Sequence, residues 1–152
     1  NLRQEIEKRG ISGQRLIFAK REEYLGDHLA RHRCGDVFVD TFNYNAHSTA
    51  MDALWCGLPV VTLMGQNSFS RVGASLLTAV GLPELIAQTE EEYEEKIISL
   101  ANDPEKLAQI KQRLEENRKT SSLFNTEQST RELEKIYCGL ISSSSDYTLL
   151  KV

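Results

Sequence analysis

One short stretch of the chain gathers side chains that could bind a phosphorylated ligand. His47, Ser48 and Thr49 stand together where a polar loop gives way to a helical pattern, and Asp52 follows three residues after Thr49. The first turn of a helix has unpaired backbone N–H groups and about half a positive charge, so it favours an anion such as a phosphate. A carboxylate one turn further along roughly the same face can accept hydrogen bonds from sugar hydroxyls. The stretch therefore predicts a nucleotide pocket.

The same residues also have a plainer interpretation. Ser48 and Thr49 could simply cap the helix, and His47 could be an ordinary loop residue. The next segment favours ligand binding, because residues 58–63 are apolar on both faces, as in a parallel strand covered by helices. Ligands commonly bind at the loops that follow such strands. The residues alone leave both interpretations open.

The rest of the sequence predicts short strands that alternate with helices. Strands are expected at residues 15–19, 36–40, 60–63 and 84–87. Helices are expected at residues 2–9, 24–33, 48–56, 71–80, 89–101, 104–119 and 126–140, and Thr89 with Glu92 forms a capping-box pattern. This alternation predicts an α/β fold of Rossmann type, in which helices flank a parallel sheet.

The overall composition suits one domain or part of one. The 152 residues are 40% hydrophobic and carry a net charge of -4, so no basic surface for nucleic acid is expected. The three cysteines, Cys34, Cys56 and Cys138, match neither a disulfide framework nor a zinc site and indicate a reducing compartment such as the cytoplasm. The sequence contains no run of about 18 apolar residues, so we expect no membrane span. Because the chain does not begin with Met, we expect a fragment of a longer protein.

Four segments of the chain resemble one known family. They are DVFVDTFNYNAHSTAMDALWCGLPVVTLMG, SRVGASLLTAVGLPELIA, EEYEEKIISLANDPEKLAQIKQRL and SSLFNTEQSTRELEKIY. These resemble the C-terminal catalytic lobe of the O-linked N-acetylglucosamine (O-GlcNAc) transferases, which are inverting GT-B enzymes of glycosyltransferase family 41. The resemblance covers residues 1–140 and implies the C-terminal, UDP-sugar-binding half of a GT-B fold. Residues 141–152 are expected to form a disordered tail.

The resemblance implies roles for the residues of the predicted pocket. His47, Ser48 and Thr49 match the family's His-Thr-Thr at the helix that holds the UDP diphosphate, with Ser48 in place of a threonine. Asp52 matches the family's acidic residue that binds the ribose.

Two residues of an earlier predicted helix also match the family. His28 matches a histidine near the nucleotide, and Arg31 matches an arginine that contacts the uracil. By spacing alone, His28 could equally be a half-buried helix residue. The lysine that the animal enzymes have near the position of Leu25, where it helps to hold the ribose, is absent here.

The resemblance also implies parts that lie outside this chain. The family has a preceding strand, followed by a glutamine and a lysine that meet the diphosphate, as well as an N-terminal catalytic lobe and usually tetratricopeptide repeats. We therefore expect that these residues alone do not form a complete active site. A missing central strand exposes sheet edges, so we expect the isolated chain to be weakly stable or to aggregate.

The reaction that the resemblance implies is transfer of N-acetylglucosamine from UDP to a Ser or Thr hydroxyl of an acceptor protein, in the cytoplasm or nucleocytoplasm. No Asp-x-Asp motif follows a strand, so no metal or cofactor is expected, and no catalytic base is assigned. Two other functions stay open. One is a non-catalytic lobe that binds nucleotide or another protein, and the other is a UDP-glucose-dependent N-glucosyltransferase that modifies Asn.

Overall fold

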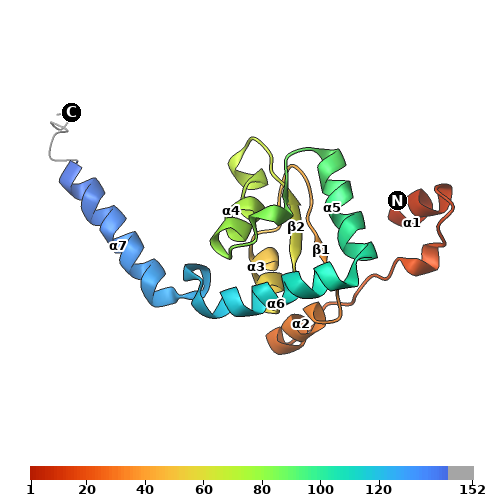
Figure 1. Cartoon of the computed structure of the whole chain (residues 1–152), viewed down its shortest axis with the longest axis horizontal. Helices are drawn as coiled ribbons and strands as arrows, with labels where there is room; N and C mark the ends of the chain where they lie inside the picture. Colours follow the sequence, from red (N-terminus) through yellow and green to blue (C-terminus); the bar gives the residue numbers. More distant parts are fainter. Residues whose placement is uncertain (144–152) are drawn as a thin grey trace.

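A computed structural model describes residues 1–143 as a small parallel sheet with helices on both of its sides (Figure 1). The strands are β1 (Phe38–Val39), β2 (Val60–Leu63) and β3 (Ile86–Ala87), in the order β1-β2-β3. Both pairings are parallel, with Phe38 opposite Val60 and Thr62 opposite Ile86. The predicted α/β class with a parallel sheet is confirmed.

Residues 1–143 form seven α-helices, close to where the sequence predicts them. They are α1 (Leu2–Lys8), α2 (Leu25–His32), α3 (Ser48–Trp55), α4 (Val72–Ala79), α5 (Glu90–Asn102), α6 (Pro104–Thr120) and α7 (Thr126–Ser143). Helices α3 and α4 lie on one side of the strands and α5 on the other (Figure 1). Within residues 1–143, no helix is long and apolar enough to cross a membrane.

The core lies between β2 and the helices that cover it. Val60, Val61 and Thr62 are fully buried, as expected of a strand covered on both faces. Leucines from the surrounding elements complete the core, namely Leu54, Leu77, Leu82, Leu100 and Leu114. The hydrophobic pattern of the sequence therefore places β2 correctly, at the centre of the fold.

The strand predicted at residues 15–19 is wrong. A short 3-10 helix covers Gly13–Arg15, and the residues after it run in an extended path that pairs with no other strand. Ile17 is 84% exposed and Phe18 is also exposed. A strand needs a neighbour for its backbone N–H and C=O groups, and the described residues offer none beside this segment.

The other strands are shorter than predicted. Residues 36–40 contain only the two-residue β1, and within residues 84–87 a 3-10 helix at Pro83–Leu85 leaves β3 as Ile86–Ala87. Pro83 suits the start of such a turn because its ring fixes φ and its missing N–H is not needed there. At the start of α5, the Thr89 hydroxyl accepts from the Glu92 N–H, while the Glu92 carboxylate accepts from the Gln88 N–H.

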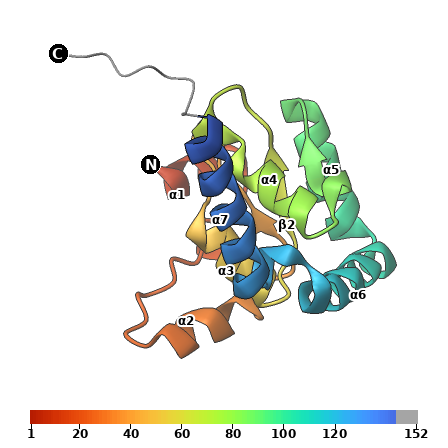
Figure 2. The ribbon, with the colours of Figure 1, turned by 90° about the vertical axis from the view of Figure 1, so that its left-hand side faces the viewer.

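Helix α7 projects from the body of the molecule (Figure 1), so it lies in front of the body when the molecule is seen from that end (Figure 2). Its apolar side chains Leu133, Ile136, Tyr137 and Leu140 are exposed along one face. The helix continues through Ser143, so residues 141–143 do not belong to a disordered tail as predicted. The remainder of that tail, residues 144–152, lies outside the described residues.

Candidate functional site

The N-terminus of α3 is open to solvent. His47 is the N-cap residue, but its side chain makes no capping hydrogen bond. Ser48 and Thr49 are exposed, and neither hydroxyl has a hydrogen-bond partner within residues 1–143. The hydroxyls therefore do not cap the helix, and the backbone N–H groups of its first turn have no side-chain acceptor. This arrangement leaves the positive end of the helix dipole and its unpaired donors available to an anion.

Helix α2 brings the other two predicted residues to the side of α3. The His28 Nε2 atom lies 3.8 Å from the Asp52 Oδ2 atom. The Arg31 guanidinium is 3.3 Å from the His28 Nδ1 atom. Because arginine only donates hydrogen bonds, Nδ1 accepts here and the imidazole carries its proton on Nε2, the atom that faces Asp52. His28, Arg31 and Asp52 thus form one connected, half-exposed polar group.

A buried carboxylate fixes the loop that leads into α3. The Asp40 Oδ1 atom accepts hydrogen bonds from the N–H groups of Thr41 at 2.8 Å and Ala46 at 2.7 Å. Its Oδ2 atom accepts a hydrogen bond of 2.7 Å from the Thr62 hydroxyl of β2. These bonds fold residues 40–46 back over the ends of β1 and β2 and so determine where α3 begins. Asp40 is the last residue of the strand predicted at residues 36–40, and the sequence alone assigns it no role.

The Tyr93 hydroxyl of α5 completes this arrangement by donating a 2.6 Å hydrogen bond to the Asp40 backbone carbonyl. Burial of the phenol, and secondly the charge of Asp40, raise the pKa of Tyr93 to about 12. The phenol therefore stays protonated, as a donor, at any physiological pH.

Buried Asn45 ties this loop to the loop that follows β2. Its backbone N–H donates to the Phe69 carbonyl at 2.9 Å, and its side-chain amide donates to the Thr41 carbonyl at 2.9 Å. Its amide oxygen accepts from the Gly73 N–H of α4 at 3.3 Å. The backbone and side chain of this one residue thus hold both loops and the start of α4 in a fixed relation beside the α3 N-terminus.

Sequence reasoning missed a group of aromatic rings at this site. Tyr44 stacks on His47 with ring centroids 4.7 Å apart, and on Phe69 with centroids 5.4 Å apart. The His47 and Phe69 rings are nearly parallel, with centroids 6.4 Å apart. The available signal was the presence of aromatic residues in both loops that border the predicted pocket, but spacing alone does not show that their rings meet.

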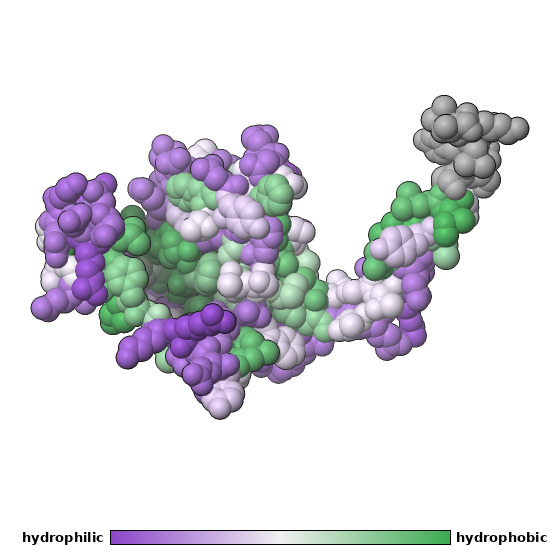
Figure 3. Space-filling view, turned by 180° about the vertical axis from the view of Figure 1, so that it is seen from behind, coloured by the Kyte–Doolittle hydropathy of each residue, from purple (hydrophilic) through white to green (hydrophobic). Residues whose placement is uncertain are grey.

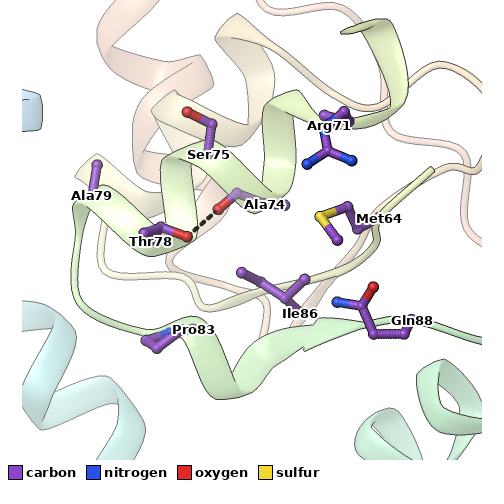
Figure 4. Close-up of a pocket in the computed structure, with 9 residues that line it drawn as sticks. All are labelled: Met64, Arg71, Ala74, Ser75, Thr78, Ala79, Pro83, Ile86 and Gln88. Carbon is purple, nitrogen blue, oxygen red and sulfur yellow. Dashed lines mark hydrogen bonds between the residues drawn. The ribbon is translucent and has the colours of Figure 1, made fainter. Parts of the chain in front are cut away.

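A large cavity lies elsewhere. It has a volume of about 770 Å³ and is lined by residues of α4 and of the segments around β3, including Arg71, Ser75, Thr78, Ile86 and Gln88 (Figure 4). A second cavity of about 520 Å³ lies at the ends of β2 and β3 and is lined by Asn43, Gln66 and Asn67, among others. None of the six predicted site residues lines either cavity.

The structure thus brings the predicted residues together as two groups, one on α2 and one on α3, which meet at the His28–Asp52 contact. Helix α3 supplies His47, Ser48, Thr49 and Asp52, and α2 supplies His28 and Arg31. Residues 1–143 contain no cluster of three or more His, Cys, Asp or Glu side chains that could hold a metal ion.

Comparisons with known proteins agree on one family. The model of glycosyl transferase family 41 matches residues 1–133. A UDP-N-acetylglucosamine–peptide N-acetylglucosaminyltransferase of Caenorhabditis elegans is 35% identical over 139 residues, which are 90% of this chain and 12% of that protein. A probable enzyme of the same name from Arabidopsis thaliana, SEC, is 36% identical over 84% of this chain and 13% of its own length.

A solved structure is similar as well. An O-GlcNAc transferase mutant of Thermobaculum terrenum superposes with a TM-score of 0.80 at 36% sequence identity, covering 90% of this chain and 26% of that one. The chain therefore spans about an eighth of the curated relatives and a quarter of this structural relative. The match over nearly all of its residues shows that the chain belongs to glycosyl transferase family 41.

Proposed function

We propose that this chain is the donor-binding lobe of an inverting glycosyltransferase that moves N-acetylglucosamine from UDP-N-acetylglucosamine to Ser or Thr hydroxyls of proteins. The observation that carries the proposal is the uncapped N-terminus of α3, with the exposed hydroxyls of Ser48 and Thr49 and the neighbouring His28–Asp52 pair. The relatives support the choice of donor and acceptor, because their names specify UDP-N-acetylglucosamine and a peptide.

The task of the α3 N-terminus is to stabilise the leaving group. As the bond between the sugar and the diphosphate breaks, negative charge grows on the diphosphate oxygens. The oriented N–H groups of the first turn, the Ser48 and Thr49 hydroxyls and the His47 ring would stabilise this charge more in the transition state than in the ground state. The proposal gives this work to protein groups and assigns no metal or cofactor to it.

The nucleoside would lie on the α2 side of α3. The Asp52 carboxylate would accept hydrogen bonds from the ribose hydroxyls, and the His28 imidazole lies next to it. The Arg31 Nη1 atom donates to the Lys20 carbonyl at 2.5 Å while Nη2 reaches His28, so the guanidinium is fixed at this edge. From there it is placed to contact the uracil.

The rest of the protein would complete the enzyme. Since the chain covers only 12% of the worm relative, we assign the acceptor contacts to an N-terminal catalytic lobe and expect tetratricopeptide repeats and a cytoplasmic or nucleocytoplasmic location for the whole protein. Neither nucleic acid nor a membrane is a proposed partner.

Calorimetry of UDP binding to the full-length protein tests the proposal. Thr49→Ala and Asp52→Asn should each weaken UDP binding roughly tenfold to a hundredfold, because a hydrogen bond to a charged group contributes about 1.5–3 kcal/mol. Two exposed residues far from the site supply matched controls, Thr120→Ala and Asp36→Asn, and both should bind UDP like the wild type. Unchanged affinity in Thr49→Ala and Asp52→Asn would refute the assigned roles.

A transfer assay with the same protein separates the enzyme from its alternatives. Labelled N-acetylglucosamine should appear on Ser or Thr of a protein acceptor. UDP binding without transfer of any sugar would instead indicate a non-catalytic lobe. Transfer of glucose from UDP-glucose to Asn would indicate an N-glucosyltransferase.

A further inference from the structure

The aromatic rings beside the α3 N-terminus are exposed, although large aromatic side chains are usually buried. Tyr44 is 60% exposed and Phe69 is 54% exposed. Tyr44 stacks on both other rings, with interplanar angles of 12° to His47 and 14° to Phe69. The Tyr44 ring therefore covers one face of the His47 imidazole, and the Phe69 ring lies beside that imidazole in nearly the same orientation.

The positions of the two aromatic residues are set by the backbone. Tyr44 belongs to the loop between β1 and α3, and Phe69 belongs to the 3-10 helix Ser68–Ser70 after β2. The hydrogen bond from the Asn45 N–H to the Phe69 carbonyl joins these loops directly next to both rings. The Asn67 side chain caps the 3-10 helix by accepting from the Ser70 N–H at 2.9 Å. The rings are thus attached to rigid parts of the fold.

The His47 side chain has little else to hold it. It does not cap α3, and within residues 1–143 its one hydrogen bond is a long contact of 3.4 Å between Nε2 and the Phe69 carbonyl. Because a carbonyl only accepts, Nε2 carries the hydrogen in this contact and Nδ1 is the nitrogen left for a ligand. An imidazolium could then donate from Nδ1 to a phosphate oxygen, and aromatic faces stabilise such a cation.

We propose that Tyr44 and Phe69 are positioning residues that hold the His47 imidazole in the orientation needed to meet the diphosphate of the nucleotide sugar. This inference rests on the proposed function and deepens it. Without the two rings, binding a diphosphate would require the imidazole to be ordered at that moment, at a cost in side-chain entropy. With them, the imidazole is ordered in advance.

Calorimetry of UDP binding to the full-length protein again supplies the test. Tyr44→Leu keeps an apolar side chain but removes the ring, whereas Tyr44→Phe keeps the ring. Since a stacked aromatic pair contributes about 0.5–1.5 kcal/mol, Tyr44→Leu should weaken UDP binding roughly twofold to twelvefold. Tyr44→Phe should bind UDP like the wild type, and Phe69→Leu should weaken binding by a smaller factor than Tyr44→Leu. Thermal midpoints equal to that of the wild type would show that these substitutions of exposed residues leave the fold intact.

A double-mutant cycle decides whether Tyr44 acts through His47. Adding Tyr44→Leu to His47→Ala should weaken UDP binding no further than His47→Ala alone, because the ring then has no imidazole to hold. Additive losses, or wild-type affinity in Tyr44→Leu, would overturn the positioning role while leaving the donor site itself in place. A wild-type protein that does not bind UDP would overturn the proposed function and this inference together.

Discussion

The Thr62 hydroxyl donates a 2.7 Å hydrogen bond to Oδ2 of Asp40, and both residues are buried where β1 and β2 end. This bond joins the ends of two neighbouring parallel strands, the edge at which ligands bind in open α/β sheets. The same carboxylate receives two backbone N–H groups of the loop that precedes α3. The shape of the candidate site therefore depends on one acidic side chain that touches no ligand in the proposed mechanism.

Asp40→Ala should strongly destabilise this lobe. The substitution leaves the buried Thr62 hydroxyl and the partly buried N–H groups of Thr41 and Ala46 without their acceptor, and a buried group left unpaired costs about 1–3 kcal/mol. Urea denaturation of the full-length protein should show a lower midpoint for the transition of this lobe. The matched control is Asp36→Ala, whose side chain is 81% exposed and forms an ion pair with Lys111, so its loss should change stability by less than about 1 kcal/mol. Equal stability of the two variants would contradict the role of Asp40.

Gly73→Ala should also destabilise the fold, although alanine is the better helix former. A Cβ atom at Gly73 would lie 2.6 Å from the Thr62 Oγ1 atom and 2.8 Å from the Asp40 Oδ2 atom. Such overpacking costs about 1–3 kcal/mol, which outweighs the helix gain of about 1 kcal/mol.

The control for Gly73→Ala is Gly26→Ala in α2, where a Cβ atom would meet nothing within 4 Å. There the helix gain is unopposed, so denaturation should show equal or slightly higher stability than the wild type. If Gly73→Ala and Gly26→Ala had the same free energy of unfolding, α4 would be able to move away from β2 and accommodate the added methyl group.

Tyr93 should make the stability of the lobe depend on alkaline pH. Its folded-state pKa of about 12 lies above its ordinary value of 10, because burial and the Asp40 charge disfavour the phenolate. The native state thus binds more protons than the unfolded chain between these values. Stability is complete below about pH 10 and falls as the pH rises towards 12, by about 2–3 kcal/mol.

The measurement compares the wild type with Tyr93→Phe across this range of pH. The variant should be less stable at neutral pH by about 1 kcal/mol, because the Asp40 carbonyl loses its donor. It should also lose less stability than the wild type between pH 10 and pH 12. Parallel curves for the two proteins would show that Tyr93 does not carry the effect.

The sequence predicts the parts of this fold that depend on local patterns. The seven helices and the buried β2 follow from hydrophobic periodicity and capping residues, and the α3 N-terminus is visible in three consecutive residues. The strand at residues 15–19 is wrong because a strand is defined by its neighbour, which local pattern does not reveal. The ring stack was missed for a similar reason, since His47 and Phe69 are 22 positions apart and meet through tertiary contacts, namely the pairing of β1 with β2 and the hydrogen bond from Asn45 to Phe69.

The free edge of β1 gives the last prediction, that the chain of 152 residues self-associates when it is produced alone. Within residues 1–143, β1 pairs only with β2, and Val39 is exposed on it, as are Ile17 and Phe18 of the extended N-terminal segment. Hydrophobic surface is visible between the N-terminal segment and the body (Figure 3). An unpaired, apolar edge is a template for pairing with another chain, so sedimentation should show oligomers or aggregates and a low thermal midpoint.

Replacing Val39 with lysine should reduce this association, because a charge at an edge strand opposes pairing with a second copy. The matched control is Ile98→Lys on α5, an exposed apolar residue away from the edge, which should associate like the wild type. A monomeric chain that melts cooperatively at high temperature would contradict the prediction, and so would equal association of Val39→Lys and Ile98→Lys. In either case the free edge of β1 would not drive association, and the fold would be stable without a further strand beside β1.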